Sequence, residues 1–274
     1  MLQTLTPVPP DALLGITTAF RADPDPAKVD LGVGVYRDER GITPIMRAVR
    51  ESERRVVANG TTKVYVGPAG NREFAAAIEE LTLGADHPAR KAGRVVTLQA
   101  PGGCGALRLG AELAKSSGAT ELVVSDPTWA NHVPLLSSAG LKLAKYAYLD
   151  AATGRADPDR VLDALGKLAA GTLVLLQGSC HNPTGADLDR GAWAAIAELL
   201  EKRGLVPFVD IAYQGLGDGL EEDAYGVRLL AERLPEVLVA VSCSKNFGLY
   251  RERVGATLVI GEAPAQANVA MGHL

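Results

Sequence analysis

Apolar runs of strand length alternate with helical segments from about residue 94 onward, and this alternation constrains the fold more than any other feature of the chain. The expected strands are RVVTL, ELVVS, LAKYAYL, TLVLLQ, LVPFVD, EVLVAVS and ATLVIG. Between them lie segments with helical periodicity, namely GALRLGAELAKS, PDRVLDALGKLA, RGAWAAIAELLEKRG and EDAYGVRLLAERL. Several strands are apolar throughout, as expected where helices cover both faces of a sheet. The sequence therefore predicts an α/β fold in which helices sandwich a mainly parallel mixed sheet.

The chain before residue 94 follows a different pattern. A Pro-rich stretch comes first, followed by a short helix around DALLGITTAF and a loop, LGVGVYRDERG. Two further helices are expected around PIMRAVRESERRVVA and NREFAAAIEELTL. The PVPP and VGPAG stretches indicate turns or an extended arm.

Composition excludes several classes of function. A formal net charge of -4 gives no reason to expect nucleic acid or an anionic membrane as a partner, and the apolar runs are far too short to span a bilayer. The sequence shows no basic segment followed by an apolar one, which is the pattern of a secretory signal. The three cysteines are scattered, which argues against a disulfide framework and against a zinc site. We therefore expect a cytoplasmic protein with no bound metal.

Two of the expected strands end in glycine-rich or amide-bearing turns. In a parallel sheet such ends gather at the edge where ligands bind. The first strand leads into PGGCG, which turns the chain into a helix at residues 103–117, and the N–H groups at a helix start form an anion site. An ordinary tight turn is the alternative, because Arg108 replaces the third glycine of GxGxxG and no Walker lysine follows. The second turn, GSCHNPTG, presents His181 and Asn182, although its residues are also common turn formers.

Two more strand ends carry ionisable residues. Asp210 closes LVPFVD, and Tyr213 follows three residues later. A carboxylate in that position is costly unless a cation or several donors pair with it. EVLVAVS leads into SCSK, where Lys245 would have a lowered pKa in a partly desolvated loop and would act as a nucleophilic amine. Most lysines are solvated surface residues, so Lys245 alone indicates little.

The combination of these groups matches the needs of pyridoxal 5'-phosphate (PLP). That cofactor needs an amine for its imine, an anion beside its pyridine nitrogen, donors for its ring oxygen and a cationic clamp for its phosphate. A competing match is S-x-x-K at Ser242 to Lys245, the nucleophile motif of penicillin-recognising serine enzymes. Neither S-D-N nor K-T-G occurs in the chain, and that motif opens a helix instead of following a strand. PLP is therefore the favoured ligand.

A series of longer motifs runs along essentially the whole chain. In order they are LGVGVYRDE, KVYVGPAGN, PGGCGALR, DPTWANH, SAGLKLAKYAYLD, CHNPTG, VDIAYQGLG and SCSKNFGLYRERVGA. The series resembles the aspartate and aromatic amino acid aminotransferases, which are class I aminotransferases of PLP fold type I. The resemblance implies exchange of an amino group between an amino acid, aspartate or aromatic, and a 2-oxo acid such as 2-oxoglutarate.

The resemblance also implies roles for single residues in catalysis. Lys245 would link covalently to PLP and later move the substrate proton, and Asp210 would pair with the pyridine nitrogen. His132 would support Asp210 from behind. Tyr213 and Asn182 would hydrogen-bond the ring oxygen. Trp129 would pack on the ring, beside the substrate.

Other matching positions would hold the phosphate and the substrate. For the phosphate these are Gly103, Cys104, Ser242, Ser244 and Arg253, joined by Tyr65 from a neighbouring subunit, so that a homodimer with shared active sites is implied. Arg253 suits a phosphate dianion because its planar fork binds two oxygens at once. Cys104 stands where the family has a hydroxyl residue, and a thiol is the poorer donor. Gly34 would lie against the substrate carboxylate, with Trp129 and Asn182 also near the substrate.

The same resemblance implies a division into domains. Residues 1–43 would form an N-terminal arm and part of a small domain, and residues 44–274 would form the PLP-binding large domain. Family members continue past this point with most of the small domain, and they carry there the arginine that grips the substrate carboxylate. Arg253 is the last arginine of this chain. A truncated PLP-binding fragment with little or no transaminase activity is therefore the alternative expectation, and a different PLP reaction, such as decarboxylation or β-elimination, is a third.

Overall fold

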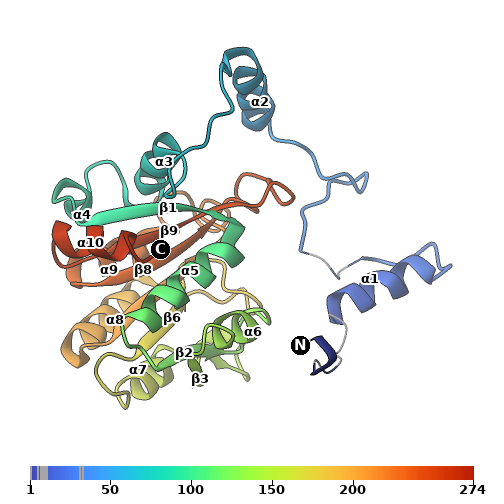
Figure 1. Cartoon of the computed structure of the whole chain (residues 1–274). Helices are drawn as coiled ribbons and strands as arrows, with labels where there is room; N and C mark the ends of the chain where they lie inside the picture. The colour runs from blue at the N-terminus through green and yellow to red at the C-terminus, as the bar shows by residue number, and fades with distance from the viewer. Residues whose placement is uncertain (1, 5, 7–11, 31, 33) are drawn as a thin grey trace. The chain divides into compact units, whose positions relative to one another are not determined.

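The computed structural model describes residues 2–4, 6, 12–30, 32 and 34–274, and these divide into two compact units, Met1–Ile45 and Met46–Leu274 (Figure 1). The domain boundary that the resemblance implies, between residues 43 and 44, stays a prediction. The first unit holds a short 3-10 helix, η1 (Leu2–Thr4), and helix α1 (Ala12–Ala22). In the loop that follows α1, Arg37 forms an ion pair of 2.8 Å with Asp30.

The second unit opens with three helices, α2 (Arg47–Asn59), α3 (Arg72–Leu83) and α4 (Pro88–Lys91). Asn71 caps α3, because its side chain accepts a hydrogen bond of 3.0 Å from the N–H of Phe74. Helix α2 has a polar sequence and buries none of its residues. It begins three residues later than the sequence pattern predicts.

One sheet forms the centre of the second unit, and among the described residues it has seven strands in the order β1-β9-β8-β7-β6-β2-β3. Their bounds are β1 Val95–Pro101, β2 Glu121–Asp126, β3 Lys142–Ala147, β6 Leu173–Gln177, β7 Val206–Ile211, β8 Val237–Ser242 and β9 Val254–Ile260. From β3 to β8 all neighbours are parallel, whereas β9 lies antiparallel between β8 and β1. The predicted fold class, a mainly parallel mixed sheet sandwiched by helices, is confirmed.

One predicted strand is divided in the structure. The run LAKYAYL, expected as a single strand, leaves the sheet after Ala147 at the end of β3. The next residues form β4 (Leu149–Asp150), which pairs with β5 (Arg155–Ala156) in a separate two-stranded hairpin. Among the described residues β3 pairs only with β2, and β2 ends at Asp126, opposite Ala147, so the sheet offers the chain no partner beyond that point.

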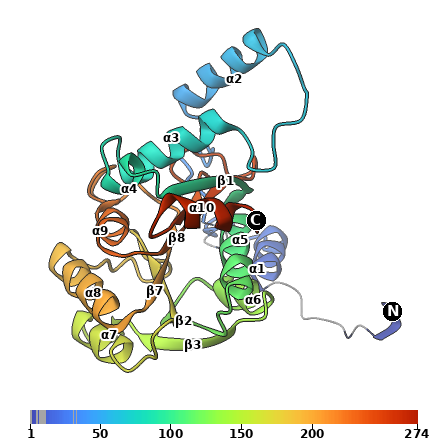
Figure 2. The ribbon, with the colours of Figure 1, turned by 60° about the vertical axis from the view of Figure 1, so that its left-hand side comes forward.

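Helices cover both faces of the sheet, as Figure 2 shows for α8 and α9 on one side of the strands and α5 and α6 on the other. The remaining helices have the bounds α5 Gly102–Ser116, α6 His132–Ser137, α7 Pro158–Leu165, α8 Arg190–Arg203, α9 Tyr225–Arg233 and α10 Pro264–Met271. Successive residues of a strand belong to different cores, since Val239 packs in one apolar cluster and its neighbours Leu238 and Ala240 pack in the other. This arrangement explains why the strands are apolar throughout.

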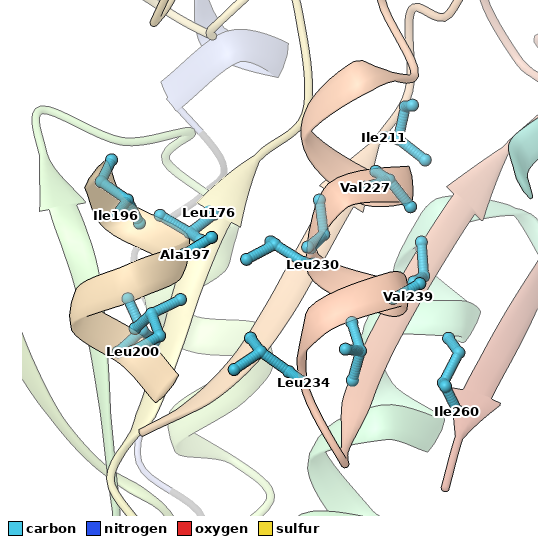
Figure 3. Packing of buried hydrophobic residues seen from close by; sticks show 14 of the residues in the cluster. Leu176, Ile196, Ala197, Leu200, Ile211, Val227, Leu230, Leu234, Val239 and Ile260 are labelled. Atoms are coloured by element: carbon cyan, nitrogen blue, oxygen red, sulfur yellow. The ribbon is translucent and has the colours of Figure 1, made fainter. Parts of the chain in front are cut away.

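The core on the α8 and α9 side is made of interlocking aliphatic side chains (Figure 3). Ile196 and Leu200 of α8 and Leu230 of α9 are fully buried there. They pack with strand residues that include Leu176 and Val239. Burial of this kind holds the parallel strands in register, and it leaves their carboxyl ends as the edge where the loops gather.

Candidate active site

A single pocket at the carboxyl edge of the sheet brings together side chains from β7, β8, helix α5 and the intervening loops. The predicted residues that line it are Gly103, Cys104, Trp129, Asn182, Asp210, Tyr213, Ser242, Ser244, Lys245 and Arg253. The sequence analysis missed four further lining residues, Leu107, Gln177, Ser179 and Ala212. The roles assigned to the predicted residues stay predictions, but the structure places them around one space.

Asp210 lies at one end of the pocket, one residue before the end of β7, and is 9% exposed. His132, fully buried at the start of α6, lies with its Nε2 atom 2.9 Å from Asp210 Oδ2. An ionised carboxylate can only accept, so His132 Nε2 carries the proton and Nδ1 accepts from the Thr128 hydroxyl at 2.7 Å. This chain of hydrogen bonds fixes the orientation of the carboxylate. Trp129 meets His132 edge to face at 5.2 Å.

The opposite end of the pocket is made of hydrogen-bond donors. Helix α5 begins there at Gly102, and Ser242 and Ser244 flank it. Arg253 donates from Nη1 to Ser244 Oγ at 3.5 Å and to the Tyr250 carbonyl at 3.1 Å. A helix start, two hydroxyls and a guanidinium in one place form an anion site.

The backbone of this end is specialised. Gly102 has φ +74, and a Cβ atom there would come within 2.5 Å of Arg253 Nη2, so a larger residue would displace the guanidinium. Arg253 itself has φ 55, in the left-handed region that side chains other than glycine rarely adopt. Strained backbone of this kind concentrates at functional sites.

Lys245 lines the same pocket and lies in the turn that follows β8. Burial lowers the pKa of its ammonium; Arg253 lowers it further, while the Asp210 carboxylate raises it. Its Nζ atom is 5.8 Å from the centre of the Tyr213 ring. A lowered pKa increases the fraction of neutral amine, which is the nucleophilic form. Lys245 follows a strand and lies at no helix start, whereas the S-x-x-K motif of the penicillin-recognising serine enzymes opens a helix.

Asn182 and Tyr213 stand on two loops beside Asp210. Burial raises the pKa of the Tyr213 phenol, and a hydrogen bond with the Asn182 side chain lowers it. The side chains of Asn182 and Tyr213 therefore both present polar groups to the pocket.

Two carboxylates that were not predicted from the sequence, the exposed Asp187 and the buried Asp223, hold these loops. Asp187 accepts from the N–H groups of Cys180 at 2.6 Å and His181 at 2.8 Å. Asp223, which is 6% exposed, accepts from Gly215 at 2.7 Å, from Asp218 at 2.9 Å and from Gly217 at 3.0 Å. In the sequence each of these acids follows a glycine-containing turn by a few residues, and that position is the signal by which they could have been found. These acids satisfy backbone donors that no sheet or helix satisfies.

His181 lies behind the pocket and does not line it. It is 3% exposed, with Ser125 Oγ 3.0 Å from Nε2 and Thr184 Oγ1 2.8 Å from Nδ1. Its ring stacks on Tyr148 at 4.0 Å. Burial lowers its pKa to about 4, so the ring is neutral near pH 7. Its role is to fill and stiffen the loop that carries Asn182.

Three predicted site residues do not line the pocket, and the first of them is His132, which contacts Asp210 from outside the lining. Tyr65 is fully exposed after α2, and its expected contact with a neighbouring subunit stays a prediction. Gly34 belongs to the other compact unit, so its expected contact with the substrate carboxylate also stays a prediction.

The groups that line the pocket fit PLP. An oriented carboxylate suits a protonated pyridine nitrogen, an amine of lowered pKa suits an aldehyde, and the donor cluster around Gly102 suits a phosphate. Cys104 lies in the first turn of α5 among the phosphate-type donors and offers only a weak S–H donor. Across the described part of the chain, no group of three or more His, Cys, Asp or Glu side chains is arranged to hold a metal ion. No helix in those residues has the length and apolarity to cross a membrane.

Comparison with known proteins gives a consistent result. Residues 26–271 match the family described as aminotransferase class I and II. The chain is 50% identical over 275 residues to an aromatic-amino-acid aminotransferase of Paracoccus denitrificans, a match that covers 100% of this chain and 69% of that protein. It is 44% identical over 265 residues to an aspartate aminotransferase of Escherichia coli strain K12, covering 96% of this chain and 67% of that one.

Solved structures agree. An aromatic-amino-acid aminotransferase from Burkholderia pseudomallei, covalently bound to pyridoxal phosphate, superposes with a TM-score of 0.96 at 43% identity. That match covers 100% of this chain and 69% of the other. The chain therefore spans about two thirds of the length of these relatives.

We expect His181 to make stability depend on pH. Its pKa in the folded protein, about 4, lies below the value of 6.5 for a free imidazole, so folding stability is complete above pH 6.5 and is lost as the pH falls towards 4. Such a shift corresponds to about 3 kcal/mol. Urea unfolding at pH 7 and pH 4.5 should show that the unmodified protein loses about 2–3 kcal/mol more than His181→Gln between the two conditions. His273→Gln, at an exposed histidine, is the control and should behave as the unmodified chain. Equal losses for all three proteins would contradict this assignment.

Proposed function

The chain belongs to the family of class I and II aminotransferases, which are PLP-dependent transferases, and on that premise we propose that it exchanges amino groups between aromatic amino acids or aspartate and a 2-oxo acid such as 2-oxoglutarate. The family resemblance inferred from the motifs is confirmed, as is PLP as the cofactor. Relatives of both substrate types support the two amino acid classes. A cytoplasmic location stays a prediction.

One observation carries the proposal: Lys245, Asp210 and the donor cluster around Gly102 line the same pocket. When bound, PLP supplies an aldehyde that captures amino groups and a ring that accepts electrons. Asp210, held by His132, would keep a proton on the ring nitrogen. Asn182 and Tyr213 would hold the ring oxygen, and Arg253 with the two serines would hold the phosphate.

Lys245 has two tasks in this proposal. As an amine of lowered pKa it would bind the cofactor. Once released, it would accept a proton from the substrate carbon and donate that proton to a different carbon atom. It shares the pocket with Asp210 and Arg253, and its Nζ atom lies 5.8 Å from the centre of the Tyr213 ring, so the amine would stay near the bound cofactor. Burial keeps the amine deprotonated for part of the time, as a general base requires.

We also propose a homodimer in which Tyr65 completes the phosphate site of the partner subunit. The segment from α2 to residue 66 exposes apolar side chains, with Val57 83% exposed, Val64 77% and Tyr65 fully exposed. Exposed apolar groups that gather in this way mark an interaction surface.

The first prediction tests the chemistry. Addition of PLP to the protein should produce a visible absorption band that aspartate or phenylalanine shifts, with release of the matching 2-oxo acid when 2-oxoglutarate is present. Lys245→Ala should give no such band, because no other described amine lines the pocket. A band that survives in Lys245→Ala would remove the proposed role of this lysine. A band without any 2-oxo acid release would instead support a PLP-binding protein that lacks transaminase activity.

The second prediction tests the phosphate end. Arg253→Gln should weaken PLP binding about 10- to 100-fold, since hydrogen bonds to charged groups contribute about 1.5–3 kcal/mol. Pyridoxal, which lacks the phosphate, should bind both proteins equally well, and absorbance titration measures both affinities. An equal loss for PLP and pyridoxal would mean that Arg253 acts on the pocket as a whole.

The third prediction tests the shared site. Tyr65→Ala and Lys245→Ala should each have low activity alone, whereas co-expression of the two variants should restore part of it, because one site of the hybrid dimer would hold both native residues. Light scattering should report a dimer. A monomer, or the absence of any restored activity, would argue against the shared site.

A further inference from the structure

Gln177 is the last residue of β6, and its side chain binds the backbone of the loop that carries Asn182. Its Nε2 atom donates to the Asn182 carbonyl at 2.9 Å, and its Oε1 atom accepts from the Asn182 N–H at 2.8 Å. The residue lines the candidate active site, and its Cα atom lies in register with that of Asp210 on the neighbouring strand. No motif in the sequence pointed to this residue.

We propose that Gln177 is a positioning residue for Asn182: its carboxamide binds the backbone N–H and C=O of Asn182 and so fixes where the Asn182 side chain lies in the pocket that it shares with Tyr213. This inference rests on the proposed function, in which Asn182 and Tyr213 both address the ring oxygen of PLP. It goes further because it assigns the cause of that placement to a residue outside the family motifs.

The N–H and the C=O of Asn182 belong to the two successive peptide units that flank its Cα atom. A carboxamide that makes both bonds therefore holds the backbone on both sides of Asn182, whereas a single bond would hold only one of the two units. Asp187 already fixes the N–H groups of Cys180 and His181, at the entry to the loop. Gln177 fixes the next residue, which is the one whose side chain faces the pocket.

The effect on the site follows from the Asn182 side chain. It lines the same pocket as Tyr213 and lowers the pKa of the Tyr213 phenol, and the two residues come from different loops. If the Asn182 backbone were free, this arrangement would form for a smaller part of the time. The ring oxygen would lose a donor, and its negative charge would then hold the neighbouring imine proton more strongly.

The test compares Gln177→Met, which keeps the length and packing of the side chain but neither hydrogen bond, with the unmodified protein. In cofactor-free protein, hydrogen exchange at the Asn182 amide should become about tenfold faster in the variant, because its N–H has lost a partner. In PLP-loaded protein, the apparent pKa of the lysine-bound chromophore, measured by absorbance against pH, should rise by about one unit, which corresponds to the loss of one donor to a charged group.

Two further variants make the result decisive. Gln266→Met removes a similar pair of side-chain contacts at Glu262 and Glu236, away from the pocket, and should change neither measurement. Gln177→Asn is one methylene too short to reach the Asn182 peptide and should behave as Gln177→Met does, which covers the case in which the methionine variant folds poorly.

Each outcome decides the question. Unchanged exchange at Asn182 would overturn the inference, and so would faster exchange with an unchanged chromophore pKa, since Gln177 would then only stabilise the loop. The exchange measurement needs no cofactor, so absence of a chromophore in the unmodified protein would count against the proposed function and would leave the contact between Gln177 and Asn182 to be judged separately.

Discussion

The buried carboxylate of Asp210 is the charge around which the pocket is arranged. Removing an ion from water costs several kcal/mol unless other groups replace the lost hydration. His132 supplies a hydrogen bond at 2.9 Å, and Thr128 in turn fixes the orientation of the imidazole. The Lys245 ammonium supplies an opposite charge nearby, since Asp210 raises its pKa against the effect of burial. The carboxylate and the amine therefore stabilise each other before any ligand binds.

Side-chain hydrogen bonds hold the backbone of the loops around this charge, which lack regular secondary structure. Asp187, Asp223 and Gln177 each use one side chain to bind two or three backbone groups of a loop. Such contacts replace the hydrogen bonds that a helix or sheet would supply. A pocket formed by loops can in this way hold Asn182 and Tyr213 in place while their side chains stay free to contact a ligand.

Most of the fold could be predicted from the sequence because its signals are local. An apolar run of strand length is visible in EVLVAVS or TLVLLQ whatever surrounds it, and polar residues at strand ends draw attention to Asp210 and Lys245. The break after Ala147 was not predicted, since it coincides with the end of the neighbouring strand β2 at Asp126, which the run LAKYAYL itself does not reveal. The roles of Gln177, Asp187 and Asp223 were also missed, because a glutamine or aspartate near a turn resembles an ordinary solvated residue until its backbone partners are known.

The sequence by itself determined the α/β class, the residues at the strand ends and, through the motif series, the family and its cofactor. These properties follow from residue type and spacing along the chain, which folding does not change. Only the tertiary structure decided that β9 lies antiparallel between β1 and β8, that Thr128 fixes the imidazole of His132, and which side chains hold the loops. Those features depend on contacts between residues far apart in the sequence or on the path of a loop, and both arise only when the strands pack side by side.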